Sequence, residues 1–226
     1  MSIDPRYPRA RQALAECLTI TGRFNEAITE VKKALDLDPL LMHMNAAVVE
    51  HNYFGRRYAE AINHGQQAIE LDPSFFPTRW CLGLAHQASG NHSEAIAQLK
   101  QARALSNDST FMTATLAAAL AAAGKNDEAN ALLIALEEIR ETRYVPQTPV
   151  AAAYVALGSI DEALSRLERA FEERCVWLIY AVSCDARFDR LREEPGFQSI
   201  VQRVMRGSRV LRNPPVPSSD GHPILP

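Results

Sequence analysis

Residues 79–102 read RWCLGLAHQASGNHSEAIAQLKQA, and the pair Glu94-Ala95 within this stretch reveals how the chain is organised. The same pair recurs at a constant step of 34 residues, as Glu26-Ala27, Glu60-Ala61, Glu128-Ala129 and Glu162-Ala163. A fixed period of roughly 20–50 residues is typical of proteins built from stacked repeats. The sequence therefore predicts five tandem units of 34 residues each.

Each unit holds two helical stretches separated by a turn. Apolar residues follow helical spacing, as at Leu14 and Leu18 in the first stretch and Val31 in the second. One repeat column carries the glycines Gly22, Gly90, Gly124 and Gly158, and Arg56 interrupts it. Glycine ends a helix readily because it adopts left-handed backbone angles without strain. A second column of small residues lies in the first helix, where we expect close helix crossings: Ala15, Gly83, Ala117 and Ala151.

These features resemble the tetratricopeptide repeat family, whose unit has this length and the pattern Trp-x2-Leu-Gly-x2-Tyr, Ala-x3-Phe, Ala and Pro. The third unit matches at Leu82-Gly83, Ala95, Leu99 and Ala102, whereas Arg79, His86 and Asn107 replace two aromatics and the proline. The resemblance covers residues 8–177. It implies an all-α fold, a right-handed superhelical solenoid of antiparallel helix pairs whose concave groove is lined by the first helices.

Both ends of the repeat region carry further expectations. Residues 170–198, which include Trp177-Leu178 and Arg187-Phe188-Asp189, resemble the segment that closes the repeat regions of bacterial adenylate cyclases, winged-helix transcriptional activators and serine/threonine kinases. We expect capping helices over 178–212, with an apolar stripe of Phe197, Ile200, Val201 and Val204 covering the last repeat. Residues 1–7 are expected to be the end of a preceding repeat or an N-terminal extension, and 213–226 a disordered proline-rich tail.

Composition and motifs disfavour a catalytic role. The chain contains no nucleophile elbow, phosphate-binding glycine loop, dinucleotide fingerprint or paired metal-binding histidines, so we expect no enzyme activity, no cofactor and no metal. A net charge of −3 makes nucleic acid an unlikely partner. The six histidines are expected on the surface or in the groove, and the four cysteines as structural thiols of a reducing cytoplasm. No apolar run is long enough to span a membrane, which favours a cytoplasmic protein.

The resemblance places partner contacts on the groove-facing positions of the first helices. The residues expected there are Arg9, Gln12, Glu16, His43, Glu50, Tyr53, Trp80, Gln87 and Phe111. The aromatic members offer the most apolar area to a partner. Two alternatives stay open: the aromatics pack between repeats, or the alanine-rich fourth unit holds another segment of the same chain. Family members that clamp a C-terminal carboxylate use Lys and Asn on these faces, and the first three units lack them.

We therefore expect a non-catalytic module that binds a peptide or partner segment in its groove, as a scaffold or sensory part of a bacterial signalling or regulatory protein. The alternative is a stand-alone adaptor that forms a homo-oligomer through the exposed first helix at its N-terminal end. In that case Leu14, Leu18 and Ile28 would have no preceding repeat to cover them.

Overall fold

The computed structural model describes residues 7–212, with backbone alone over 207–212, and this part of the chain is helical without any strand. Ten helices form five antiparallel pairs: α1 (Pro8–Ile20) with α2 (Phe24–Leu35), α3 (Met42–Phe54) with α4 (Tyr58–Leu71), α5 (Phe76–Ala88) with α6 (His92–Leu105), α7 (Thr110–Ala122) with α8 (Asn126–Ile139), and α9 (Gln147–Leu157) with α10 (Ile160–Glu172). Three more helices follow: α11 (Leu178–Ser183), the 3-10 helix η1 (Ala186–Leu191) and α12 (Pro195–Arg212). The expected all-α solenoid is confirmed.

The turns within the helix pairs follow the glycine column. Gly22, Gly90, Gly124 and Gly158 all have φ between 75° and 80°, the left-handed region that glycine occupies without strain. Arg56 takes this conformation with φ 62° at the one position where the column carries a side chain. Because a Cβ atom makes this region costly, an arginine retained there calls for a compensating contact.

Small residues permit the predicted helix crossings. Ala15, Ala117 and Ala151 are completely buried, and a Cβ atom on Gly83 would lie 2.6 Å from Cγ of Leu99. A larger side chain at these positions would push the paired helices apart.

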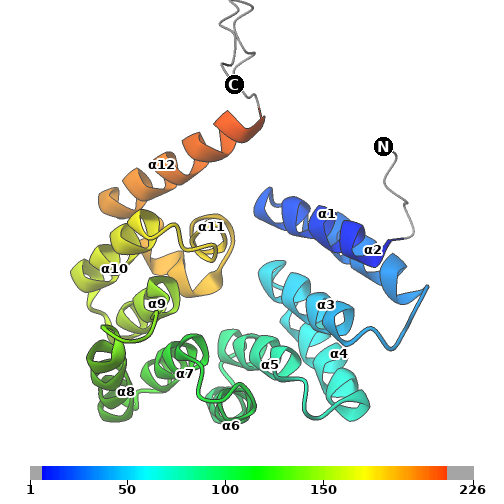
Figure 1. Ribbon diagram of the computed structural model, residues 1–226, viewed down its shortest axis with the longest axis horizontal. Helices are drawn as coiled ribbons and strands as arrows, with labels where there is room; N and C mark the ends of the chain where they lie inside the picture. The colour runs from blue at the N-terminus through cyan, green and yellow to red at the C-terminus, as the bar shows by residue number, and fades with distance from the viewer. Residues whose placement is uncertain (1–6, 213–226) are drawn as a thin grey trace, which may run out of the picture.

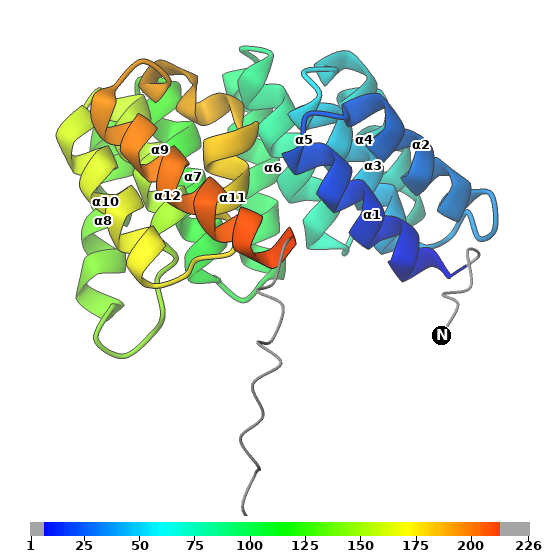
Figure 2. The same cartoon turned by 90° about the horizontal axis from the view of Figure 1, so that it is seen from above.

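The five pairs follow one another along an arc, and α11 lies inside that arc (Figure 1). Helix α12 packs beside α10 and α11 on the open side of the arc, as both views show (Figures 1 and 2). Its predicted apolar stripe faces inward: Phe197 and Ile200 are buried, and Val201 and Val204 pack against the same core.

The N-terminal end is better covered than the sequence suggested. Leu18 and Ile28 are buried, so the expectation that they lack cover is wrong for these two; only Leu14 remains 47% exposed. Residues 1–6 of the predicted N-terminal extension and the predicted tail from residue 213 lie outside the described residues. No helix in the described range 7–212 is long and apolar enough to cross a membrane.

Candidate interaction surface

The nine residues expected to contact a partner lie on the first helices of the first four pairs. Those on α1 and those on α3 before Tyr53 reach solvent: Arg9 and His43 are exposed, and Gln12, Glu16 and Glu50 are half-buried. The candidate aromatic residues that follow in the sequence are more deeply buried: Tyr53 is 1% exposed and Trp80 is 7% exposed. The surface therefore has an accessible polar part on α1 and α3 and a covered aromatic part on α3, α5 and α7.

The cover over the aromatic part is a segment of the same chain. We call residues 177–192, which include α11 and η1, the inner segment. The ring of Trp177 lies 5.1 Å from the rings of both Trp80 and Phe111, which themselves contact each other at 5.3 Å. Next along the inner segment, Tyr180 stacks on Phe54 at 4.9 Å. In this conformation the aromatic side chains predicted to anchor a partner are already occupied.

A buried polar cluster fixes the inner segment beside α3. The Tyr53 hydroxyl donates to Oδ1 of Asp185 over 2.7 Å, and Nη2 of Arg187 donates to Oδ2 of the same carboxylate over 2.6 Å. Burial by itself raises the pKa of Asp185, but the Arg187 guanidinium and the Tyr53 hydroxyl outweigh it and hold that pKa below its ordinary value. Asp185 is therefore a carboxylate in the folded chain.

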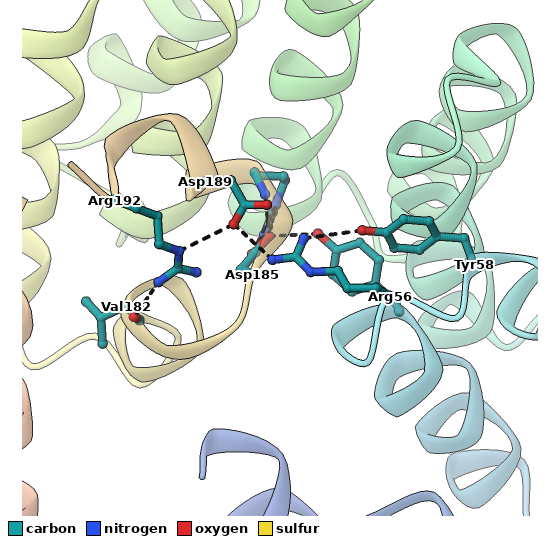
Figure 3. Close-up of polar contacts among 8 residues, drawn as sticks. Arg56, Tyr58, Val182, Asp185, Asp189 and Arg192 are labelled. Atoms are coloured by element: carbon teal, nitrogen blue, oxygen red, sulfur yellow. Dashed lines mark hydrogen bonds and ion pairs between the residues drawn. The ribbon is translucent and has the colours of Figure 1, made fainter. Parts of the chain in front are cut away.

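A second polar contact joins the inner segment to the turn between α3 and α4, as Figure 3 shows. Nη2 of Arg56 donates to Oδ1 of Asp189 over 2.9 Å, and Nη1 of Arg56 donates to the Tyr58 hydroxyl over 3.2 Å. Asp189 also accepts from Arg192, which donates in turn to the carbonyl oxygen of Val182. Arg56, the residue that interrupts the glycine column, is thus the one that reaches across to η1.

Two carboxyl groups on the accessible part have raised pKa values. Burial raises the pKa of Glu50 to about 8, and the neighbouring Glu16 adds to the shift. Burial also raises the pKa of Glu16, against a hydrogen bond from Gln12. Within the described residues neither group forms an ion pair, so a cation brought by a partner would lower both pKa values.

The histidines and cysteines differ partly from expectation. His51 and His86 are buried rather than on the surface or in the groove, and Nδ1 of His51 lies 2.8 Å from the Thr19 hydroxyl oxygen. Burial lowers the pKa of His51 to about 4, so its ring is neutral at pH 7. All four cysteines are free: Cys17 is exposed, and Cys81, Cys175 and Cys184 are buried. Over the described part of the chain, no three potential metal ligands come together.

The sequence did not indicate that Trp177, Tyr180 and Asp185 lie in the concave face. They follow the last repeat and stand 97 or more residues after Trp80 and Tyr53. No column of the repeat therefore relates them to those two residues. The sequence does show that Arg56 interrupts the glycine column, and this is the residue that contacts Asp189 of the inner segment.

The geometry defines an α-helical repeat protein of stacked antiparallel pairs. The chain belongs to the tetratricopeptide repeat family: a family model of that description matches residues 56–181, and a second one matches 8–39. No curated protein matches the sequence. The resemblance of the closing segment to bacterial cyclases, activators and kinases stays a prediction.

Solved structures share this fold at low sequence identity. A thermophilic TPR protein of Thermus thermophilus is 20% identical, with a TM-score of 0.61 over 91% of this chain and all of that one. MamA is 21% identical, with a TM-score of 0.50 over 77% of this chain and 96% of that one. In the structure of Naa15/Naa10 bound to HypK-THB, one chain is 15% identical, with a TM-score of 0.51 over 92% of this chain and 37% of that one.

Proposed function

We propose that this chain is a non-catalytic protein-interaction module that receives a partner segment on the accessible part of its concave surface, formed by α1 and α3. The tetratricopeptide repeat family generally binds protein partners, and one similar structure is itself a complex of several proteins. The observation that carries the proposal is the division of the concave surface. Arg9, Glu16, His43 and Glu50 reach solvent, whereas the inner segment covers Tyr53, Trp80 and Phe111.

The chemistry of the accessible part supports a polar, partly basic partner segment. Glu16 and Glu50 form no ion pair within residues 7–206, and a Lys or Arg side chain of a partner placed beside them would favour their ionised form. Arg9 and His43 at the rim, with the amide of Gln12, would select by charge and hydrogen bonding. The role of the whole protein as a scaffold or sensory part in bacterial signalling is a further part of the proposal and rests on the closing segment alone.

The experiment is a comparison of partners captured by matched variants. Arg9→Glu with His43→Glu changes two exposed side chains on the concave surface, and Lys32→Glu with Gln67→Glu changes two exposed ones on the second helices. We expect the first pair to lose at least one specific partner that the wild type and the second pair retain. Identical sets of captured proteins from all three would refute the assignment of the surface.

Self-association is a second candidate, because Leu14 on α1 is half exposed. Light scattering of the purified chain and of Leu14→Glu tests it. A dimer in the wild type that dissociates in the variant supports this candidate, and a monomer at high concentration refutes it.

A further inference from the structure

A groove of about 340 Å³ lies between α11 and α12. It is lined by residues of both helices and of the turn before α12: Val182, Arg192, Phe197, Gln198, Val201 and Gln202. A second hollow of about 320 Å³ continues it along α12, since it shares Val201 and Gln202 and adds Met205 and Arg206. We call the two together the α12 groove.

Contacts within the chain fix the floor of the α12 groove. Val182 and Phe197 are buried, and Nη1 of Arg192 donates to the carbonyl oxygen of Val182 over 2.8 Å. The guanidinium of Arg192 also lies 5.8 Å from the centre of the Phe197 ring. The floor is therefore formed before any ligand arrives, which lowers the cost of binding.

Two side chains present accessible apolar surface in the α12 groove. Val201 and Met205 are half-buried, and their spacing of four residues places them on one face of the helix. Gln202 and Arg206, which follow each of them, are exposed. An apolar stripe with a polar edge suits a ligand segment that carries aliphatic side chains beside a polar one.

The charge at the α12 groove is positive. Arg192 and Arg206 are the charged residues that line it, and Arg192 already pairs with Asp189. Arg206 is exposed and forms no ion pair among the described residues. It is therefore available to an anionic side chain.

The residues that follow α12 match this groove in character. Residues 213–226 read NPPVPSSDGHPILP, with Asp220 but no Lys or Arg, and Ile224-Leu225 as the adjacent aliphatic pair. Such a composition provides no core of its own, so burial of the pair requires a surface elsewhere. Pro214 and Pro215 come directly after the described helix, and proline does not continue a helix.

The length of this segment allows Ile224 to reach Val201. Val201 lies 11 residues before the end of α12 at Arg212, which is about 16 Å along the helix axis. Ile224 lies 12 residues after Arg212, and an extended chain of that length spans up to about 40 Å. The surplus permits a reversal of direction. A tether this short keeps the pair at an effective concentration on the order of millimolar, so a weak contact suffices.

We propose that the α12 groove binds residues 220–226 of the same chain, with Ile224 and Leu225 against Val201 and Met205 and the Asp220 carboxylate paired with Arg206. The order along the chain agrees, because a segment running back along α12 meets Arg206 before Val201, as Asp220 precedes Ile224. The site uses no residue of α1 or α3, and it goes beyond the proposed function.

Nuclear Overhauser measurements on the full chain with labelled methyl groups test the proposal. We expect cross-peaks between the methyl groups of Ile224 or Leu225 and those of Val201 or Met205. A mixture of differently labelled chains separates contacts within one chain from contacts with a second copy. Cross-peaks that arise only between different chains would refute a site for the chain's own segment.

Substitutions in the segment test which side chains bind. Ile224→Asp with Leu225→Asp should lower the bound fraction at least about tenfold, because two aliphatic side chains lose their burial. The shifts of the Val201 and Met205 methyl groups report this fraction. Circular dichroism checks that the variant folds as the wild type does.

A substitution in the α12 groove has a matched control on the same helix. Gln202→Glu gives Arg206 a competing partner four residues away and should lower the bound fraction about two- to threefold. Ser199→Glu adds the same charge at an exposed position of α12 that does not line the groove, and it should leave the contact unchanged.

The proposal is overturned if no cross-peak joins Ile224 or Leu225 to Val201 or Met205, or if Ser199→Glu weakens the contact as much as Gln202→Glu. Cross-peaks from the aliphatic pair to Leu14, which lines a hollow on α1 and α2, would place the segment elsewhere and would also refute it. A negative capture experiment at α1 and α3 leaves these outcomes unaffected. Failure of this site and failure of the proposed interaction surface are therefore distinguishable.

Discussion

The two parts of the concave surface start from the same helical framework and end in different environments. On α1 and early α3 the inward positions hold Arg9, Glu16 and His43 and remain accessible. On late α3, α5 and α7 they hold Tyr53, Trp80 and Phe111 and are covered by the inner segment. The comparison teaches that an aromatic on the inner face of a solenoid can be core rather than binding surface, depending on which segment returns to cover it.

Among substitutions in the covered part, we expect Asp185→Ala to cause the largest loss of folding stability. The change leaves Arg187 and Tyr53 buried without their shared acceptor, and breaking a buried pair in this way costs about 3–5 kcal/mol. Urea unfolding followed by circular dichroism measures it. Asp189→Ala removes an exposed ion-pair partner on the same helix and should cost less than about 1 kcal/mol. Equal losses of stability for the two variants would contradict the burial of the cluster around Asp185.

Trp177→Ala should have the next largest effect. It removes a ring that contacts Trp80, Phe111 and Tyr180, and we expect a loss of about 2–3 kcal/mol because the side chain is half-buried. The fluorescence of Trp80 should shift to longer wavelength as water reaches it. The neighbouring Val176→Ala, at an exposed position, should change stability by less than about 0.5 kcal/mol. An unshifted Trp80 spectrum in the tryptophan variant would argue against the contact.

The pH dependence of folding stability tests the burial of the Glu50 carboxyl group, which lies on α3 next to the covered aromatic residues. The pKa of Glu50 is about 8 in the folded chain against an ordinary 4.5, so the folded state retains a proton that the unfolded state loses. The contribution of Glu50 to folding stability should therefore be greatest below pH 4.5 and should fall as pH rises toward 8. At about 1.4 kcal/mol per pKa unit the change is at most a few kcal/mol.

Glu50→Gln should flatten that fall, and the exposed Glu60→Gln should not. Stability curves of the wild type and both variants between pH 4.5 and 8 provide the measurement. His51, the next residue, contributes with the opposite sign: its pKa of about 4 in the folded chain, against 6.5, removes stability as pH falls between those values. If the Glu50→Gln variant showed the same decrease of stability with pH as the wild type, the burial of the Glu50 carboxyl group would be contradicted.

The smallest effect on folding belongs to the accessible part. Arg9→Glu with His43→Glu should change stability by less than about 0.5 kcal/mol, because both side chains are exposed and neither belongs to a buried cluster. Urea unfolding checks this. A loss comparable to that of Trp177→Ala would show that this part, too, is core.

The fold was predictable because its determinants repeat. The Glu-Ala step, the glycines at helix ends and the small residues at crossings each recur at 34 residues, and each has a local structural reason. The resemblance to the family implied that the nine candidate residues lie on first helices, and they do.

The covering of Tyr53, Trp80 and Phe111 was not predictable in the same way. It depends on contacts between a repeat and a segment after the last repeat, such as Trp80 with Trp177, and no periodic pattern encodes such pairs. The burial of His51 was missed because one hydroxyl, that of Thr19, accommodates the ring from the preceding repeat. The sequence showed Arg56 only as an interruption of the glycine column and did not predict its contact with Asp189.

The central claim is that the inner segment lies within the concave surface, and its most direct test is the distance between the two tryptophans. Trp80 and Trp177 are the chain's two tryptophans, and their ring centres lie 5.1 Å apart with the rings nearly perpendicular. A nuclear Overhauser experiment on the native chain should show cross-peaks between the two indole rings. Two separately resolved indoles with no cross-peak between them would contradict the placement of the inner segment.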